Sequence, residues 1–222
     1  MKMLSLPGKF NVPKDVKILL VLSVVLNLSR FLFFGPSPLV FILWNIFLSF
    51  LPFVVSYILL QYTKSRLGVK SINKLVFTIL AVLWLLLIPN APYIITDLIH
   101  LVHSKGVPVI YDTFLLFTSA WVGLLLGFYS LSHIEEVVRM KYSSKITTII
   151  ISVIILLISI GLYLGRFLRF NSWDVFYNKE FYSGVWSTFS YTSSNSDSFV
   201  FIILSFIFIL VSYQAWKYRK VE

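Results

Sequence analysis

Six long apolar stretches, separated by short polar connections, run along the chain. They cover residues 16–34, 39–60, 72–88, 109–131, 146–168 and 199–216. Stretches of this kind have the length that an α-helix needs to cross the hydrocarbon core of a bilayer. Helix breakers such as Gly35-Pro36 and Gly106 lie in the connections. The pattern predicts an all-α, polytopic membrane protein with about six transmembrane helices, forming a single integral-membrane domain over residues 1–222.

The third stretch is short, and two prolines interrupt the chain after it. An apolar helical pattern then resumes and continues to residue 103. Asn90 suits the N-cap position and Pro92 suits the first turn of a helix. Asp97, His100 and His103 recur every three residues and form one polar stripe. We therefore expect a broken third helix, followed by a short interfacial half-helix over residues 91–103.

Composition supports a membrane protein and excludes several classes of function. Hydrophobic residues make up 58% of the chain and charged residues 13%, with a mean hydropathy of +0.88, which excludes a soluble globular domain. The absence of cysteine excludes disulfides, thiolate nucleophiles and cysteine-ligated metal centres. The net charge of +10 does not indicate nucleic acid as a partner, because the basic residues cluster between apolar stretches. The lipid bilayer is the expected partner.

The distribution of basic residues predicts the orientation. Six spans place both termini and the second and fourth connections on one face. Of the 19 Lys and Arg residues, four lie in the N-terminal segment, four in the second connection, three in the fourth and three in the C-terminal tail. This face is expected to be cytoplasmic. The first span follows a 15-residue leader and precedes Gly35-Pro36, so we interpret it as a retained helix and not a signal peptide.

Ionisable residues in the opposite, outer half need a different explanation. Charged groups in an apolar setting are costly and require partners or a use. Arg30 lies in the outer third of the first span, and Asp112 comes about one turn after the start of the fourth. Arg166 and Arg169 are i, i+3 neighbours at the end of the fifth. We expect these arginines to meet the outer carboxylates and histidines in one cluster.

Several motifs in this half resemble a known family. They are LIPNAPYIITDLIHL at residues 87–101, GRFLRFNSWDV at residues 165–175, Tyr111-Asp112 and Trp44-Asn45. Together they resemble the bacterial integral-membrane family called domain of unknown function 1361, from the second span through Asp174. Phe170 stands where tryptophan is more common, which keeps an aromatic ring. The resemblance implies a multi-pass protein of the bacterial cytoplasmic membrane, with both termini cytoplasmic by the charge rule, and supplies no activity.

One interpretation of the cluster is an anion site. Paired guanidinium groups suit phosphate, and a helix beginning near Asn90 would offer free backbone N–H groups. Asp97 or His100 would then act as base or nucleophile. The substrate would be a phosphate-bearing, lipid-linked molecule of the cell envelope. The expected anion-binding residues are Arg166, Arg169, Asn90, Arg30 and Asn171, supported by Asn45, Tyr93, Asp112 and Asp174.

Other interpretations stay open. A divalent metal is a weaker alternative, with Asp97, His100 and Asp112 as ligands, because an Asp-x-x-His spacing arises easily by chance. The arginines would otherwise only neutralise the aspartates and fix the helix order, as in a non-catalytic assembly or scaffold subunit. A transporter of lipids or small solutes is disfavoured by apolar inner halves of the spans. The sequence is compatible with an enzyme, a transporter and a scaffold, and it sets no oligomeric state.

Two further segments carry expectations. Residues 170–198 form an outer loop rich in Trp, Tyr and Phe, which would either cover the polar cluster at the interface or form an ordinary aromatic belt. Near the cytoplasmic end of the fourth span, Glu135-Glu136 and Arg139 invite comparison with an intramembrane protease motif. The arginine comes one residue early, so we expect an i, i+4 ion pair between Glu135 and Arg139.

Overall fold

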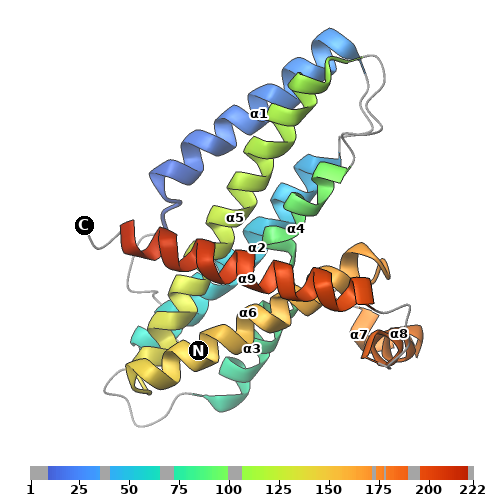
Figure 1. Ribbon diagram of the computed structural model, residues 1–222. Coiled ribbons are helices and arrows are strands. Elements are labelled where there is room, and N and C mark those ends of the chain that lie inside the picture. Colours follow the sequence, from blue (N-terminus) through green and yellow to red (C-terminus); the bar gives the residue numbers. More distant parts are fainter. Residues whose placement is uncertain are drawn as a thin grey trace. The chain divides into compact units, whose positions relative to one another are not determined.

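The protein is helical throughout the residues that the computed structural model describes, which are 10–35, 41–65, 73–99, 107–171, 174–177, 179–189 and 196–219 (Figure 1). In these residues, six helical segments are long and apolar enough to cross a membrane: Lys14–Phe34, Phe41–Ser65, Lys74–Ile99, Val109–Arg139, Ser144–Arg166 and Asp197–Arg219. The prediction of an all-α, polytopic membrane protein is confirmed.

The helices begin and end within a few residues of the predicted bounds, with two exceptions, the third candidate span and helix α5 (Val109–Arg139). The third span was expected to end at residue 88 and extends to Ile99. Helix α5 was expected to end at Leu131 but continues to Arg139. The extension is amphipathic, since Ile134 and Val137 are buried. The expected ion pair stabilises it, with the Arg139 Nη2 atom 2.6 Å from Glu135 Oε1. The nine helices of the described residues are α1 (Lys14–Phe34), α2 (Phe41–Ser65), α3 (Lys74–Leu87), α4 (Asn90–Thr96), α5 (Val109–Arg139), α6 (Ser144–Arg166), α7 (Asp174–Tyr177), α8 (Lys179–Phe189) and α9 (Ser196–Arg219).

The break in the third span is confirmed, but the role expected for Asn90 is wrong. Helix α3 ends at Leu87, and α4 begins at Asn90 after a turn containing Pro89, which has no N–H to continue the helix. Asn90 is the first residue of α4 and not its N-cap, and its side-chain amide donates to the Leu87 carbonyl at 2.9 Å. The part of the expected half-helix from residue 100 to 103, with both histidines, lies outside the described residues.

The expected aromatic loop at 170–198 is partly helical. It contains the short helix α7 and the 11-residue helix α8. The hydropathy pattern did not predict these two helices, because they contain too few apolar residues to span a bilayer. Their aromatic side chains recur at the spacing of one helix face, which is the pattern that would have indicated a helix.

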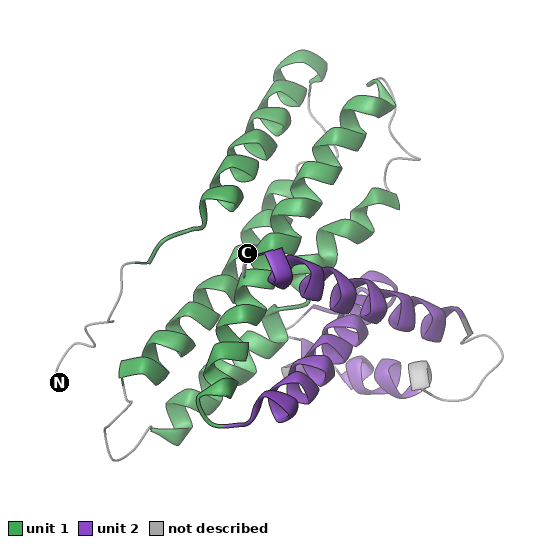
Figure 2. Ribbon diagram, turned by 60° about the vertical axis from the view of Figure 1, so that its left-hand side comes forward, with its two compact units in different colours: residues 1–141 green, residues 142–222 purple. Residues whose placement is uncertain are grey.

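The chain divides into two compact units, Met1–Lys141 with α1 to α5 and Tyr142–Glu222 with α6 to α9 (Figure 2). The expectation of a single integral-membrane domain over residues 1–222 stays a prediction.

Helix α5 is the centre of the first unit. In its apolar stretch 78% of the residues are buried, compared with 17% in α1. It packs against α1, α2 and α4. Leu115, Val122 and Leu126 are fully or almost fully buried along its length. The exposed apolar side chains of the outer helices, such as Leu32 and Phe33, are suited to contact with the lipid bilayer.

Two glycines allow α4 to approach α5 closely. Gly123 and Gly127 lie one turn apart on α5, and both face Ala91 of α4. A Cβ atom added at Gly123 would collide with the carbonyl oxygen of Ala91, and one added at Gly127 would lie 3.1 Å from the Ala91 Cβ. Small residues let transmembrane helices gain van der Waals contact where no hydrophobic effect drives their association. The position of α4 therefore depends on these glycines.

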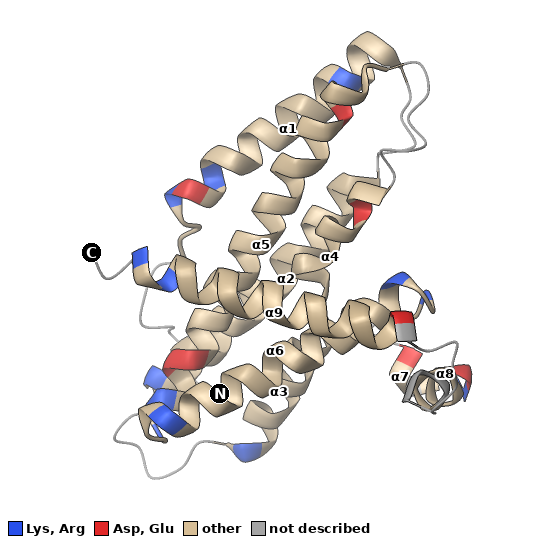
Figure 3. Ribbon diagram, in the orientation of Figure 1, with Lys and Arg blue, Asp and Glu red and all other residues tan. Residues whose placement is uncertain are grey.

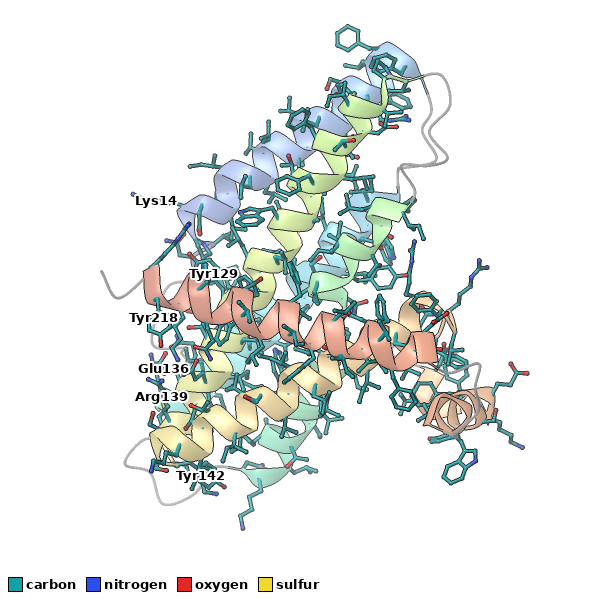
Figure 4. All side chains as sticks on the ribbon, viewed as in Figure 1. Lys14, Tyr129, Glu136, Arg139, Tyr142 and Tyr218 are labelled. Atoms are coloured by element: carbon teal, nitrogen blue, oxygen red, sulfur yellow. The ribbon has the colours of Figure 1, made fainter. Side chains whose placement is uncertain are left out.

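Helix α1 is held on α5 by hydrogen bonds at several levels. Ser23 and Ser119 share a hydrogen bond of 2.7 Å between their buried Oγ atoms. The hydroxyl of Tyr111 donates to the Leu26 carbonyl at 2.8 Å. Near the start of α1, the hydroxyl of Tyr129 donates to the carboxylate of Asp15, whose two oxygens lie at 2.9 and 3.0 Å. Figure 4 labels Tyr129 and Lys14, the residue before Asp15. Such bonds stabilise a helix that is mostly exposed to lipid.

In the second unit, α6 and α9 pack against each other. The Ser198 hydroxyl donates to the Tyr163 hydroxyl at 2.6 Å, which ties the start of α9 to the last turns of α6. The Tyr163 ring stacks on the Phe167 ring, and the Phe201 ring meets Phe167 edge to face. The two helices thus form a hairpin, and α7 and α8 belong to the connection between them.

Candidate functional site

The structure brings Arg30 of α1 and Asp112 of α5 together in a buried ion pair. Arg30 Nε lies 2.6 Å from Asp112 Oδ1, and Nη2 lies 3.2 Å from Oδ2. Asp112 has no exposed surface and Arg30 is 4% exposed. Two nearly parallel hydrogen bonds are the geometry in which a guanidinium binds a carboxylate best. The pair fixes the end of α1 against the start of α5.

A second buried carboxylate lies at the end of α4. Asp97 follows Thr96, the last residue of α4, and is 1% exposed. Its Oδ2 accepts a hydrogen bond of 2.8 Å from the side-chain amide of Asn45 on α2. Tyr93, one turn earlier on α4, is half-buried. The expected supporting residue Asn45 is therefore in contact with the expected catalytic residue Asp97.

The arginines at the end of α6 lie in the second unit and differ in exposure from Arg30. Arg166 is the last residue of α6 and is half-buried, while Arg169 is exposed. Arg169 has φ 58°, in the left-handed region. The chain reverses there, since the N–H of Phe170 donates back to the Leu164 carbonyl at 3.2 Å. Left-handed backbone is what this reversal requires, and glycine would adopt it without a steric cost.

A tight turn follows the arginines. The N–H of Asn171 donates to Asp174 Oδ2 at 2.6 Å, and the N–H of Asp174 donates to the Asn171 carbonyl at 3.0 Å. Asp174 is 7% exposed, whereas Asn171 is exposed. The carboxylate of Asp174 thus stabilises the return of the chain toward α7, and its neighbours Arg166 and Arg169 flank the same segment.

The expected site residues fall into two sets. Arg30, Asn45, Asp97 and Asp112 belong to the first unit, together with Tyr93 and Asn90. Arg166, Arg169, Asn171 and Asp174 belong to the second. The convergence of both sets in one cluster stays a prediction, and His100 lies outside the described residues. Within the first unit, Figure 3 shows Lys, Arg, Asp and Glu at the ends of the helices, where charge is least costly in a bilayer.

Among the described residues, no three or more His, Asp or Glu side chains are grouped so that they could hold a metal ion. The alternative with Asp97, His100 and Asp112 rests on a histidine outside these residues, so it stays a prediction. The N-terminus of α4 also gives the anion interpretation no support, because α4 has only seven residues and the Asn90 amide is bonded to Leu87.

Sequence reasoning missed polar contacts of α5 with α2 and α3 in the first unit. His133 Nδ1 lies 3.0 Å from the Ser56 hydroxyl, between α5 and α2. Trp84 Nε1 donates to the Ser130 hydroxyl at 2.7 Å, and Ser130 donates to the Pro52 carbonyl at 3.0 Å. Uncharged residues scattered in apolar helices carry little signal. Their helical spacing on facing helices is the only pattern that would have indicated them.

Comparison with known proteins identifies a family without a function. The family model described as "Protein of unknown function (DUF1361)" matches residues 44–212. No curated protein and no solved structure matches the chain. The matched region begins at Trp44, so it includes Asn45, Asp97, Asp112, Arg166 and Arg169, but not α1 with Arg30.

Proposed function

The chain belongs to the DUF1361 family of proteins of unknown function, and because that membership supplies no activity, we propose a function from the arginines after α6. The protein binds a phosphate-bearing molecule of the membrane, either a phospholipid or a lipid-linked phosphate, through Arg166 and Arg169. The orientation predicted from the basic residues would place this site in the outer leaflet, with both termini cytoplasmic.

The observation that carries the proposal is the backbone of Arg169. A non-glycine residue in the left-handed region costs on the order of 1 kcal/mol relative to glycine. The chain holds an arginine there, and the side chain is exposed. Such a residue is best explained by a use for its guanidinium. By contrast, Arg30 is satisfied by a buried carboxylate of the protein itself.

The neighbourhood of Arg169 suits a phosphate. Arg166 is three residues earlier, at the C-terminal end of α6, where the helix dipole also favours a cation. Two guanidinium groups present fixed forks of N–H donors that match phosphate oxygens. Both lie at the end of a candidate membrane span, the level at which lipid phosphates lie. This arrangement supports recognition of a headgroup more than of a soluble anion.

A reaction on the bound phosphate is a further step of the proposal. Asp97 or His100 would act as base or nucleophile. Asp97 is buried and bonded to the Asn45 amide, so a substrate could reach it only after a rearrangement of α4. The geometry therefore supports binding better than modification.

Binding can be tested with the purified protein in detergent. We would titrate it with fluorescent phosphatidic acid, with a polyprenyl phosphate, with inorganic phosphate and with a neutral diacylglycerol. The variants are Arg166→Ala and Arg169→Gly, the second of which keeps the left-handed backbone while removing the charge. Lys179→Ala, which removes a nearby exposed cation, is the matched control.

We expect the lipid phosphates to bind and the diacylglycerol not to bind. Loss of one bidentate contact should weaken binding about tenfold or more in each arginine variant, and Lys179→Ala should bind like the wild type. Binding of inorganic phosphate alone would indicate a soluble anion. Unchanged affinity in both arginine variants would contradict the proposal.

The second candidate is a non-catalytic assembly subunit. The buried Arg30–Asp112 pair favours it, because this pair uses two of the outer charges for fixing α1 on α5. A subunit of this kind would lose folded protein, and not a specific ligand, when its charges are removed. The yield of folded Asp97→Asn and Arg169→Gly protein on size-exclusion chromatography distinguishes the two candidates.

A further inference from the structure

Helix α8 has two different faces. At helical spacing, Phe181, Tyr182, Val185 and Trp186 fall on one side of the helix and Glu180 and Ser183 on the other, with Lys179 at the boundary beside Trp186. The helix has 11 residues and is about 16 Å long, too short to cross a bilayer. The apolar face of such an amphipathic helix must contact other apolar groups, either of the protein or of lipid.

One edge of the apolar face is covered by the segment that follows α6. The rings of Phe181 and Phe170 lie edge to face, with centroids 5.3 Å apart. Gly184 is equally close, since a Cβ atom there would lie 2.7 Å from the Phe170 ring and 3.3 Å from a Leu168 methyl group. The chain between α6 and α8 thus holds α8 at the end of a candidate membrane span.

The other edge of the apolar face is exposed. Trp186 is 77% exposed and Tyr182 is 62% exposed. The Tyr182 hydroxyl donates to the Val175 carbonyl at 2.7 Å, so the polar tip of this ring is satisfied while the ring itself is uncovered. Trp and Tyr side chains whose rings are largely exposed at the end of a span are typical of membrane–water interfaces.

We infer that α8 lies in the plane of the membrane interface, with Tyr182 and Trp186 inserted between lipid headgroups and acyl chains. The occupant of the exposed face is lipid because of the connectivity: α6 before it and α9 after it are both candidate spans that pack against each other. A helix fixed by Phe170 to the end of one span stays at the bilayer surface. Glu180 and Ser183 on the opposite face then point toward the water.

This inference does not rest on the proposed phosphate site. The insertion of α8 requires only the aromatic face and the two spans beside it, whereas phosphate binding requires the guanidinium groups of Arg166 and Arg169. Either proposal can be wrong while the other holds, because phosphate binding is measured by ligand titration and the insertion of α8 by fluorescence quenching.

The absence of cysteine in the chain makes site-specific probes straightforward. We would place single cysteines by Tyr182→Cys and Trp186→Cys on the aromatic face, and by Glu180→Cys and Ser183→Cys on the polar face. Leu204→Cys, at an exposed position within α9, is the lipid-facing control. Each is labelled with the fluorophore NBD and reconstituted in phosphatidylcholine vesicles, with or without a doxyl-labelled phosphatidylcholine quencher.

We expect blue-shifted emission at 182, 186 and 204, and quenching by the doxyl lipid that is about twofold or more stronger there than at 180 and 183. Equal quenching on the two faces of α8, with quenching intact at 204, would overturn the inference. Blue-shifted emission at 182 and 186 without quenching would also overturn it, since a second copy of the chain or another protein would then cover the face.

Discussion

The contact between α4 and α5 makes a graded prediction for two glycines. In Gly123→Ala the new methyl group meets the Ala91 carbonyl oxygen, a backbone atom that cannot rotate away, and lies 3.1 Å from Ile94 Cδ1. Helix α4 must then move away from α5. In Gly127→Ala the nearest atom is the Ala91 Cβ at 3.1 Å, which requires a shift of only a few tenths of an ångström.

The expected magnitudes follow from these contacts. Forcing a methyl group into a packed helix contact costs about 1–3 kcal/mol, and the Ala91 oxygen places Gly123→Ala at the upper end. Replacing glycine by alanine inside a helix stabilises the helix by about 1 kcal/mol, because alanine has the higher helix propensity. We therefore expect Gly123→Ala to destabilise the protein by about 2 kcal/mol. Gly127→Ala should be close to neutral, because the small clash and the gain in helix propensity offset each other.

A second substitution sharpens the test. Ala91→Gly removes the Cβ that Gly127→Ala would meet, but it leaves the carbonyl oxygen that Gly123→Ala would meet. A double-mutant cycle should therefore give a favourable coupling energy for Gly127→Ala with Ala91→Gly, and a coupling energy near zero for Gly123→Ala with Ala91→Gly. The assay is reversible unfolding of the purified protein in mixed detergent micelles. A Gly123→Ala protein as stable as the Gly127→Ala protein would refute the close packing of α4 on α5.

Three further predictions concern charge and topology. Arg30→Met removes the guanidinium group that is paired with the fully buried Asp112 and should lower the free energy of unfolding by about 3–5 kcal/mol. The double variant with Asp112→Leu should recover much of this loss; a single variant as stable as the wild type would contradict the pair. Ser23→Ala should lower the free energy of unfolding by about 0.6 kcal/mol in the same assay, and a double-mutant cycle with Ser119→Ala should give a coupling energy of about the same size, since each single variant removes the shared bond. Single cysteines introduced in the N-terminal segment and the C-terminal tail should resist a membrane-impermeant maleimide in intact cells and react after lysis; reaction in intact cells would reverse the predicted orientation.

The spans could be predicted because hydropathy reports burial in lipid directly. The extension of α5 to Arg139 could not, because its polar residues lower the hydropathy although Ile134 and Val137 keep the helical period. The helix α8 was missed for a related reason: its aromatic residues were interpreted as a loop, and only their spacing on one face indicates a helix. The N-cap role of Asn90 was wrong, since the break at Pro89 is so short that Asn90 already belongs to α4.

The candidate site was predictable in part. Charges in apolar segments are rare enough to stand out, and the sequence singled out Arg30, Asp112, Asn45 and Asp97, which the structure places in one buried and one partly buried contact. The partners of each charge were not predictable, because they depend on the relative rotation of α1, α2, α4 and α5. The left-handed backbone of Arg169 was invisible in the sequence, where arginine gives no turn signal.

The most direct test of phosphate recognition at the end of α6 is native mass spectrometry of the protein purified from membranes. We expect the wild type and Lys179→Ala to retain a phosphorylated lipid, and the Arg166→Ala, Arg169→Gly double variant to lose it while remaining folded. A folded double variant that carries the same lipid in the same proportion would contradict the account.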